Sequence, residues 1–476
     1  MVEGVPLKIN YRDSQKGHVT MSNGQIKAES STIEYVRIRP DGGLTPISKG
    51  FLKTAEGEID GDIIFTILDI IESNKPNHKV LVIGDVMLDY YMYCDQTKLL
   101  ESQKHNVDED YSFSKGYDEK KKLGGAAHIA YACASFAQKV GLLGIIGEDS
   151  QGWELIQEVK KIRDEEKIPL EFFPYKVKSY LTITKMYMEA KIEGDKEYQH
   201  ANPKKINKER KVIRINRELK EDAGRIKISP EIDKIENIID NLIKEYDCVI
   251  FKDHQKGFLS SDLLDADVVM PIVSSINMKK KANEDRFTVF VDPKYQWEKF
   301  RALRIDAIIP NVKEAAAGAN RLDLKNIPMS QREKVIDERE KAIAAREEAS
   351  SLNPEDWKKL GENLPGTSCF VVTADRNGAS LYRPGRDKYK LLNCPANIEE
   401  GQALSEIGCG DVFDAIFIAV MVNKQSIMKR LEFDELDVDF YALRLANYAA
   451  GLALCDGGSE IITPEKIRSA LRDKSN

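Results

Sequence analysis

The sequence predicts a doubly wound α/β fold with a mostly parallel sheet, and three observations lead to this prediction. Short, continuous apolar runs recur along the chain, as they do in parallel strands that are buried on both faces. Stretches with helical spacing separate several of these runs, and polar residues follow the points where the runs end. In a fold of this kind, ligands bind in the crevice beyond the carboxyl ends of the strands.

The individual elements follow this alternation of strand and helix. The expected strands are 80–83, 140–147, 248–251, 288–291, 307–310 and 369–373, and the expected helices include 126–136 and 232–246. Two polar stretches, about 90–122 and about 178–220, fit the alternation poorly. Part of the second alternates with a period of two over residues 182–188. We expect both stretches to belong to a small β lid beside the main sheet.

Residues 1–78 have a different pattern from the rest of the chain. Residues 36–40 alternate like a short strand before the turn signal at 41–43, and residues 63–71 have helical spacing. A break at 74–77 follows, and a new unit begins at Lys79. We therefore expect an N-terminal appendage over 1–78, with a packing or oligomerisation role or one still unknown, and a main domain over 79–476.

Composition excludes several classes of protein. The 476 residues are 42% hydrophobic and 31% charged, with a net charge of −7, which does not suit a general nucleic-acid binder. The seven cysteines include no Cys-x-x-Cys pair, which argues against a disulfide framework or a structural zinc site. No signal peptide and no apolar run of about 20 residues is found. We expect a cytoplasmic protein that binds neither membrane nor nucleic acid.

The most informative segment lies near the C-terminus, where Gly408-Cys409-Gly410-Asp411 runs into an apolar stretch with helical character. A Gly-x-Gly turn that opens a helix leaves backbone N–H groups free to bind an anion such as a phosphate. A carboxylate in the first turn could take a proton from an attacking hydroxyl. Ordinary strand-to-helix turns carry the same pattern, so other parts of the chain must decide between the two interpretations.

Polar residues follow the predicted buried strands. They are Asp85, Asp89, Gly124, Gly125, Asp253, Lys256, Asp292, Lys294, Asn311 and Glu314. In an open α/β sheet these loop positions converge on one crevice. Acids, amides and lysines collected there suit a polyhydroxy ligand, a phosphate and a magnesium ion. The glycines at 124–125 suit a ligand loop, although a close contact between helix and strand would need the same residues.

This ordered set resembles the ribokinase-like (PfkB) carbohydrate kinases, and the strongest likeness is to the heptose 7-phosphate kinase domain of enzymes that make nucleotide-activated heptose. The similar segments are 82–90, 123–127, 252–257, 291–294, 310–314, 372–381 and 446–451. Each motif is short, but their order is specific, and the likeness covers about residues 79–470.

The resemblance implies ATP-dependent phosphoryl transfer to the anomeric hydroxyl of a sugar phosphate, with heptose 7-phosphate giving the 1,7-bisphosphate, as a step in nucleotide-sugar biosynthesis. Asp411 would be the base, and Gly408, Cys409 and Gly410 would form the anion hole. The sugar phosphate would contact Asp85, Asp89, Gly124, Gly125, His128, Lys256 and Arg214, the last from a basic cluster over 204–217. ATP would lie near Asn311, Glu314, Thr373, Gly378 and Asn447, and Asn311 and Glu314 would hold Mg²⁺ through water.

Three departures from the family pattern bear on these expectations. Ser405 and Glu406 stand where the family usually has Asp-Thr, which leaves activation by a monovalent cation open. Cys409 replaces a usual Ala, and a small side chain should be tolerated because the turn acts through its backbone. His128 replaces a usual Asn that contacts the sugar. No His-x-Gly-His motif is found, so we expect the nucleotidyltransferase half that often accompanies this kinase to be absent from the sequence.

Two alternatives to a heptose phosphate kinase stay open. His128 and the variant turn are compatible with a kinase of another sugar or of a nucleoside. Ser405, Glu406 and the N-terminal segment are compatible with a kinase-like protein that binds a sugar phosphate or a partner without catalysis. Because lid sheets in this family often pair between subunits, the resemblance also implies a homodimer formed through the lid.

Overall fold

The computed structural model describes most of the chain from residue 61 onward and short strands before it. The described residues are 9–11, 20–22, 25–27, 32–34, 36–38, 44–46, 61–95, 118–191, 212–218, 226, 228, 232–260, 264, 268–282, 287–320, 331, 352, 354–384, 390–394, 408–455 and 461–475.

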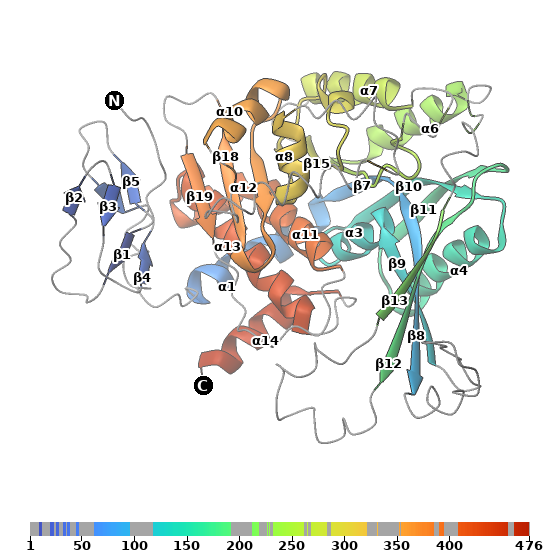
Figure 1. The fold of residues 1–476 in the computed structure, drawn as a ribbon, viewed down its shortest axis with the longest axis horizontal. Helices are drawn as coiled ribbons and strands as arrows, with labels where there is room; N and C mark the ends of the chain where they lie inside the picture. The colour runs from blue at the N-terminus through green and yellow to red at the C-terminus, as the bar shows by residue number, and fades with distance from the viewer. Residues whose placement is uncertain are drawn as a thin grey trace.

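A sheet of nine strands forms the centre of the molecule (Figure 1). Its order is β11 (Leu170–Val177), β10 (Lys139–Gly147), β7 (Lys79–Gly84), β14 (Cys248–Lys252), β15 (Thr288–Asp292), β16 (Ala307–Ile308), β17 (Phe370–Thr373), β18 (Ala379–Arg383) and β19 (Lys390–Cys394). The strands from β11 to β17 are parallel, and β18 and β19 add an antiparallel edge. The predicted doubly wound, mostly parallel α/β fold is confirmed.

Helices cover both faces of this sheet. One face carries α1 (Gly61–Asn74), α3 (Ala126–Cys133), α4 (Ser150–Glu165), α11 (Cys409–Val422), α12 (Lys424–Leu431), α13 (Glu435–Cys455) and α14 (Pro464–Ser475). The other face carries α6 (Ile232–Glu245), α7 (Val269–Ala282), α8 (Val312–Asn320) and α10 (Pro354–Asn363). Short 3₁₀ turns lie at Lys75–Asn77, Glu298–Phe300 and Asp375–Asn377.

Each central strand contributes to two separate hydrophobic cores. In β7, Val80 and Val82 face the core that contains α11, whereas Leu81 and Ile83 face the core that contains α6. Successive side chains of a strand point to opposite faces of its sheet, so a strand buried on both sides must be apolar throughout. This explains why the strands were recognisable in the sequence as continuous apolar runs.

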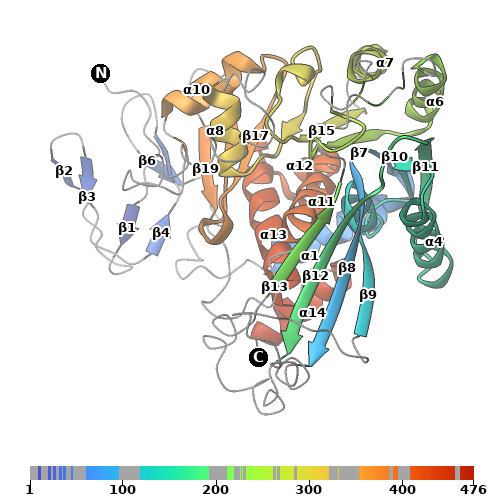
Figure 2. The ribbon, with the colours of Figure 1, turned by 45° about the vertical axis from the view of Figure 1, so that its right-hand side comes forward.

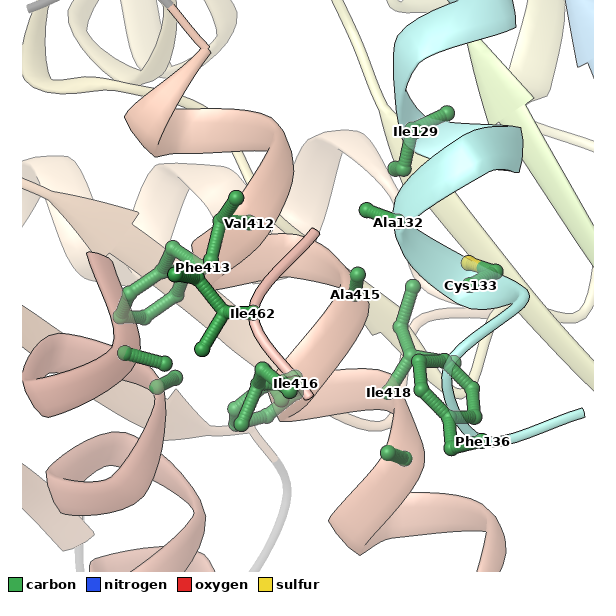
Figure 3. Packing of buried hydrophobic residues seen from close by; sticks show 14 of the residues in the cluster. Ile129, Ala132, Cys133, Phe136, Val412, Phe413, Ala415, Ile416, Ile418 and Ile462 are labelled. Carbon is green, nitrogen blue, oxygen red and sulfur yellow. The ribbon is translucent and has the colours of Figure 1, made fainter. Parts of the chain in front are cut away.

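The packing of α3 against α11 places two loops of the sheet side by side. Figure 3 shows Ile129, Ala132 and Cys133 of α3 facing Ala415 and Ile418 of α11. The small side chains of Ala132 and Ala415 allow the two helices to approach closely. As a result, the first turn of each helix lies at the same end of the sheet.

A second sheet of four strands projects from the main sheet (Figure 2). Its order is β13 (Val212–Arg217), β12 (Ile183–Lys191), β8 (Val86–Asp95) and β9 (Asp118–Gly125), and only β12 and β8 are parallel. This sheet is the expected small β lid. Its strands begin next to the main sheet, because β8 follows β7 after the single residue Asp85.

The described residues of the N-terminal segment form three short strand pairs and the helix α1. The pairs are β1 (Ile9–Tyr11) with β4 (Thr32–Glu34), β2 (Thr20–Ser22) with β3 (Gln25–Lys27), and β5 (Val36–Ile38) with β6 (Leu44–Pro46). Helix α1 buries Ile64, Ile67 and Ile71 in the core shared with α11 and α13. The segment before residue 78 is therefore not wholly separate from the main unit. Among the residues that the structure describes, no helix is both long and apolar enough to cross a membrane.

Candidate active site

Helix α11 begins at the turn that the sequence singled out. Gly408 precedes the helix with a φ of 84°, in the left-handed region that glycine adopts without strain. Asp411 lies in the first turn, and a Cβ added at Gly410 would meet no atom within 4 Å. The N–H groups of a first helical turn have no partner within the helix. An accessible glycine at this position leaves room for an anion next to them.

Asp411 is held between two cationic or hydrogen-bonding side chains from other elements. Its Oδ2 atom lies 2.8 Å from Nδ1 of His128, in the first turn of α3, and its Oδ1 atom lies 2.6 Å from Nζ of Lys252, at the end of β14. Burial alone would raise the pKa of the Asp411 carboxyl group. The Lys252 charge and the His128 hydrogen bond outweigh burial and hold this pKa well below its usual range.

Lys252 is the centre of a small charge cluster. Its ammonium group also pairs with Asp292 at the end of β15 and lies 3.9 Å from Oδ2 of Asp414, one turn along α11. Burial and the neighbouring Asp292 raise the pKa of Asp414 well above its usual range. Asp292, Asp411 and Asp414 have oxygens close enough together to hold a cation. Because Lys252 Nζ already contacts all three, the lysine itself supplies the positive charge at this point.

Asp85, directly after β7, is buried at 1% exposure. Its Oδ2 atom accepts hydrogen bonds of 2.9 Å from the N–H groups of His254 and Lys256. Its Oδ1 atom has no hydrogen-bond partner among the described residues. Burial, followed by the charge of Asp253, raises the pKa of Asp85 to about 6. A buried acceptor without a partner suits a ligand hydroxyl.

The glycines at 124–125 serve packing as well as the predicted loop. A Cβ at Gly124 would lie 2.6 Å from Oδ1 of Asp89, and a Cβ at Gly125 would lie 2.3 Å from the backbone oxygen of Asp85. Gly125 also has a φ of 56°. These contacts support the packing interpretation of the glycines and bring the loop against Asp85 and Asp89, while their role as a ligand loop stays a prediction.

Asn311 and Glu314 begin α8 with reciprocal hydrogen bonds. The Asn311 side chain accepts from the Glu314 N–H, and Glu314 Oε2 accepts from the Asn311 N–H, both at 2.9 Å. Glu314 Oε1 pairs with Lys294 at 3.0 Å. Since both carboxylate oxygens already have partners, these two residues are better suited to contact with Mg²⁺ through water than to direct coordination.

The residues expected near the nucleotide lie beside this pair or help to hold the sheet edge. The Thr373 N–H donates to the carbonyl of Pro310 at 3.0 Å, which brings β17 next to Asn311. Gly378 has a φ of 83° in the turn to β18. The Asn447 amide donates to the Cys394 carbonyl at 3.0 Å and so joins α13 to β19.

Several curated relatives of the chain share one name. "Bifunctional protein HldE" of Nitratiruptor sp. is 28% identical over 396 residues, which are 82% of this chain and 64% of the relative. The protein of the same name from Campylobacter jejuni (strain RM1221) is 24% identical over 407 residues, 85% of this chain and 66% of the relative. The chain thus spans about two thirds of the length of these relatives. No protein-family model matches it.

Among solved structures, ribokinase from Giardia lamblia superposes with a TM-score of 0.51, at 16% identity, over 83% of this chain and 99% of the ribokinase. The chain is similar in sequence to the HldE proteins and has a ribokinase-like fold. This agrees with the resemblance that the sequence motifs indicated, from residues 82–90 to 446–451.

In this ribokinase-like fold, loops far apart in the sequence come together as predicted. Asp411, His128 and Lys252 join three elements at one point, and Asp85 binds the loop that contains Lys256. Lys256 itself pairs with Glu218, next to β13 of the lid. Of the other expected positions, Ser405, Glu406 and residues 204–211 of the basic cluster lie outside the described residues, and only the backbone of Arg214 is described.

Lys252 and Asp414 had no assigned role in the sequence. Lys252 belongs to the motif 252–257, and Asp414 belongs to an apolar helix. A single charged residue in such a helix is usually interpreted as exposed to solvent. One signal was available: Asp414 follows Asp411 by three residues, so both lie on one face of a helix. Of two other acids considered as metal ligands, Asp253 caps its loop by accepting from the Gln255 N–H and pairs with Lys299, whereas Asp292 joins the Lys252 cluster.

Proposed function

We propose that this chain is an ATP-dependent carbohydrate kinase. It transfers the γ-phosphoryl group of ATP to the anomeric hydroxyl of a sugar phosphate, and heptose 7-phosphate is the substrate that the resemblance of the sequence motifs implies. The observation that carries the proposal is the first turn of α11, where Gly408 and Gly410 leave an open helix start and Asp411 stands beside it. An anion site with an adjacent carboxylate is what phosphoryl transfer to a hydroxyl requires.

The surroundings of this turn support the sugar side of the reaction. The unpartnered Oδ1 of Asp85 and the buried Asp89 lie at the junction of the main sheet and the lid, where a polyhydroxy ligand could bind. The ion pair between Lys256 and Glu218 connects the loop after β14 to the lid. A lid over the site would exclude water and so favour transfer to the sugar over hydrolysis of ATP.

Asn311, Glu314, Thr373, Gly378 and Asn447 support the nucleotide side. The first two would contact the water shell of Mg²⁺, and the ion when bound would neutralise charge on the phosphates of ATP. We also propose that the protein forms a homodimer through the lid and that it is intracellular. Experiment decides whether the reaction requires a monovalent cation. Light scattering on the purified protein tests the dimer.

The test is ATP consumption by the purified protein against sugars and sugar phosphates, with heptose 7-phosphate isomers included. We expect turnover with a heptose phosphate and a fall of about 10³-fold or more for Asp411→Asn, with ATP binding retained. Asp164→Asn is the matched control, because Asp164 is an exposed aspartate of α4 that belongs to no part of the proposed site. Turnover with another sugar alone would keep the reaction and change the substrate.

A second candidate function is binding of a sugar phosphate without catalysis. The observation in its favour is that both oxygens of Asp411 are already engaged, by His128 and by Lys252. No turnover with any acceptor, together with a sugar phosphate that raises the melting temperature equally in wild type and Asp411→Asn, would support this function and contradict the kinase.

A further inference from the structure

The side chain of Lys252 points toward α11, and the pattern of β14 explains why. Cys248 and Ile250 of this strand face the core that contains α11, so residue 252 points to the same side. The neighbouring strand β15 repeats the pattern, because Phe290 belongs to that core and Asp292 follows it by two residues. Lys252 and Asp292 are partners in the register of the two strands. The strands therefore direct a cation and a carboxylate toward the start of α11.

Helix α11 brings Asp411 and Asp414 to this pair. Lys252 Nζ lies 2.6 Å from Oδ1 of Asp411 and 3.9 Å from Oδ2 of Asp414, and the Lys252 side chain is only 8% exposed. Burial alone would lower the pKa of the Lys252 ammonium group, but its three carboxylate neighbours outweigh burial and raise this pKa well above its usual range. Lys252 therefore stays a cation and neither gives nor takes the proton that the reaction moves.

The contact with Lys252 leaves Asp411 able to act as the proton acceptor. A carboxylate has about four lone-pair positions on its two oxygens. Lys252 uses one position on Oδ1 and His128 uses one on Oδ2, so each oxygen keeps a second position. Two partners from different elements also fix the orientation of the carboxylate plane. Because phosphoryl transfer depends mostly on positioning and on stabilisation of charge, a fixed orientation of Asp411 matters for the reaction.

We propose that Lys252 is the positioning residue for Asp411, and that its ammonium group holds the carboxylate in the orientation in which it takes the proton from the substrate hydroxyl. The inference rests on the proposed kinase function and deepens it. In the transfer, the hydroxyl O–H bond breaks and its proton bonds to Asp411, while the hydroxyl oxygen bonds to the γ-phosphorus of ATP. The bond from the γ-phosphorus to the β–γ bridging oxygen breaks, and ADP leaves with that electron pair.

Lys252 also limits the negative charge that ATP meets at this point. Asp292, Asp411 and Asp414 each have an oxygen within 4.8 Å of the other two. Lys252 contacts all three, so its charge offsets the repulsion among them and between them and the phosphates of ATP. Removing the lysine therefore has two effects: it releases Asp411 from its position, and it leaves a carboxylate charge without compensation.

Two variants separate these effects. Lys252→Ala removes the cation alone, which lowers stability and should raise KM for ATP as well as lower kcat. The double variant Lys252→Ala/Asp292→Asn removes both members of an ion pair, so the net charge of the cluster stays as in the wild type. In the double variant we expect kcat to fall about 10²-fold with little change in KM for ATP, because only the position of Asp411 is lost.

A small amine tests whether the missing ammonium group causes the loss. Ethylammonium is small enough to enter the space that the lysine side chain leaves. We expect it to raise kcat of the double variant several-fold, whereas sodium chloride at the same ionic strength should not. A purely structural role of Lys252 would give no such response, because the amine replaces the cation and not the packing of the side chain.

Lys280→Ala is the matched control. Lys280 is also a buried lysine that pairs with an aspartate, Asp306. Asp306 accepts from the N–H of Val289 near the start of β15, at the other end of the strand from Asp292. Loss of Lys280 should lower the melting temperature but leave kcat, and its lack of response to ethylammonium, as in the wild type.

Melting temperature and ATP binding show whether each variant is folded. If the double variant keeps the wild-type kcat, Lys252 only balances charge and the inference is wrong, while the kinase function stands. The inference is also wrong if ethylammonium raises kcat no more than sodium chloride does, or if the double variant unfolds where Lys280→Ala stays folded. If the wild type transfers phosphate to no acceptor, the proposed function fails and the inference fails with it.

Discussion

At the scale of single residues, the two oxygens of Asp85 have different surroundings. Oδ2 accepts two backbone hydrogen bonds, whereas Oδ1 is buried next to Gly257 with no hydrogen-bond partner among the described residues. An unpartnered buried acceptor destabilises the ionised form. A bound ligand hydroxyl would satisfy Oδ1. This energetic cost is therefore consistent with a role of Asp85 in binding rather than in stability.

Asp85 makes the free energy of unfolding depend on pH in a defined direction. Its pKa is raised from 3.8 to about 6, so the folded protein keeps a proton that the unfolded chain releases. The resulting stabilisation is fully present below about pH 4 and is lost as pH rises through about 6. We expect wild type to lose roughly 3 kcal/mol relative to Asp85→Asn over this interval. Denaturant unfolding of both proteins at several pH values measures the difference.

The comparison between the two proteins removes the contributions of Glu314 and Asp414, whose pKa values are also raised and which both proteins share. A constant difference from pH 4 to pH 7 would show that Asp85 is not desolvated as the structure describes. In the same variant we expect a higher KM for the sugar and an unchanged KM for ATP, since Asp85 belongs to the proposed sugar side.

At the scale of elements, the sequence predicted which segments form strands better than it predicted where these strands end and which strands pair. Strands β7, β10 and β14 were predictable because burial on both faces makes every residue apolar. Strand β16 is only two residues long, although 307–310 is an apolar run, because Pro310 lacks the N–H that a further ladder bond needs. Helix α3 ends at Cys133, three residues before the predicted end, although Phe136 beyond it is buried.

The candidate site was predictable where backbone geometry decides it and not where side chains meet across elements. A Gly-x-Gly-Asp turn announces a helix start from local sequence alone. The contacts of Asp411 with His128 and Lys252 depend on how α3 and β14 pack against α11. Residues 128, 252 and 411 are far apart along the chain, so no local pattern could indicate that their side chains meet.

Two glycines in the site loops should respond in opposite ways to the same substitution. Gly125→Ala places a Cβ 2.3 Å from the Asp85 oxygen at a φ of 56°. We expect it to lower the free energy of unfolding by at least about 1–3 kcal/mol, the usual cost of such a backbone conformation. Gly410→Ala meets no atom and adds helix propensity in α11, so its stability should equal or exceed that of wild type by up to about 1 kcal/mol. Thermal unfolding measures both.

Equal melting temperatures for the two variants would contradict the close approach of the Gly125 loop to Asp85. If Gly410→Ala is folded and stable but binds ATP weakly, the open space at the start of α11 is used by the nucleotide, as the proposed function requires.

At the scale of the whole molecule, the helix before residue 78 is part of the main core. Helix α1 buries Ile64, Ile67, Leu68, Ile70 and Ile71, and its surface residues Asp69 and Glu72 pair with Arg468 of α14 at 2.7 and 2.5 Å. These ion pairs join α1 to α14, although the two helices are nearly 400 residues apart in the sequence. We therefore propose a structural boundary at about residue 60 as an alternative to the expected boundary at 78.

Truncation separates these two boundaries. A chain that begins at residue 61 keeps α1, whereas one that begins at 79 loses it and exposes apolar surface of α11, α12 and α14. Each of the five buried side chains contributes about 1.5–3 kcal/mol, so the shorter chain should unfold at a much lower temperature or aggregate. Because residues before 61 contribute no side chain to the candidate site described above, the chain from 61 should keep the turnover of the full protein. Equal melting temperatures for the two truncated chains would show that α1 does not stabilise the main unit, and that the N-terminal segment is an appendage up to residue 78.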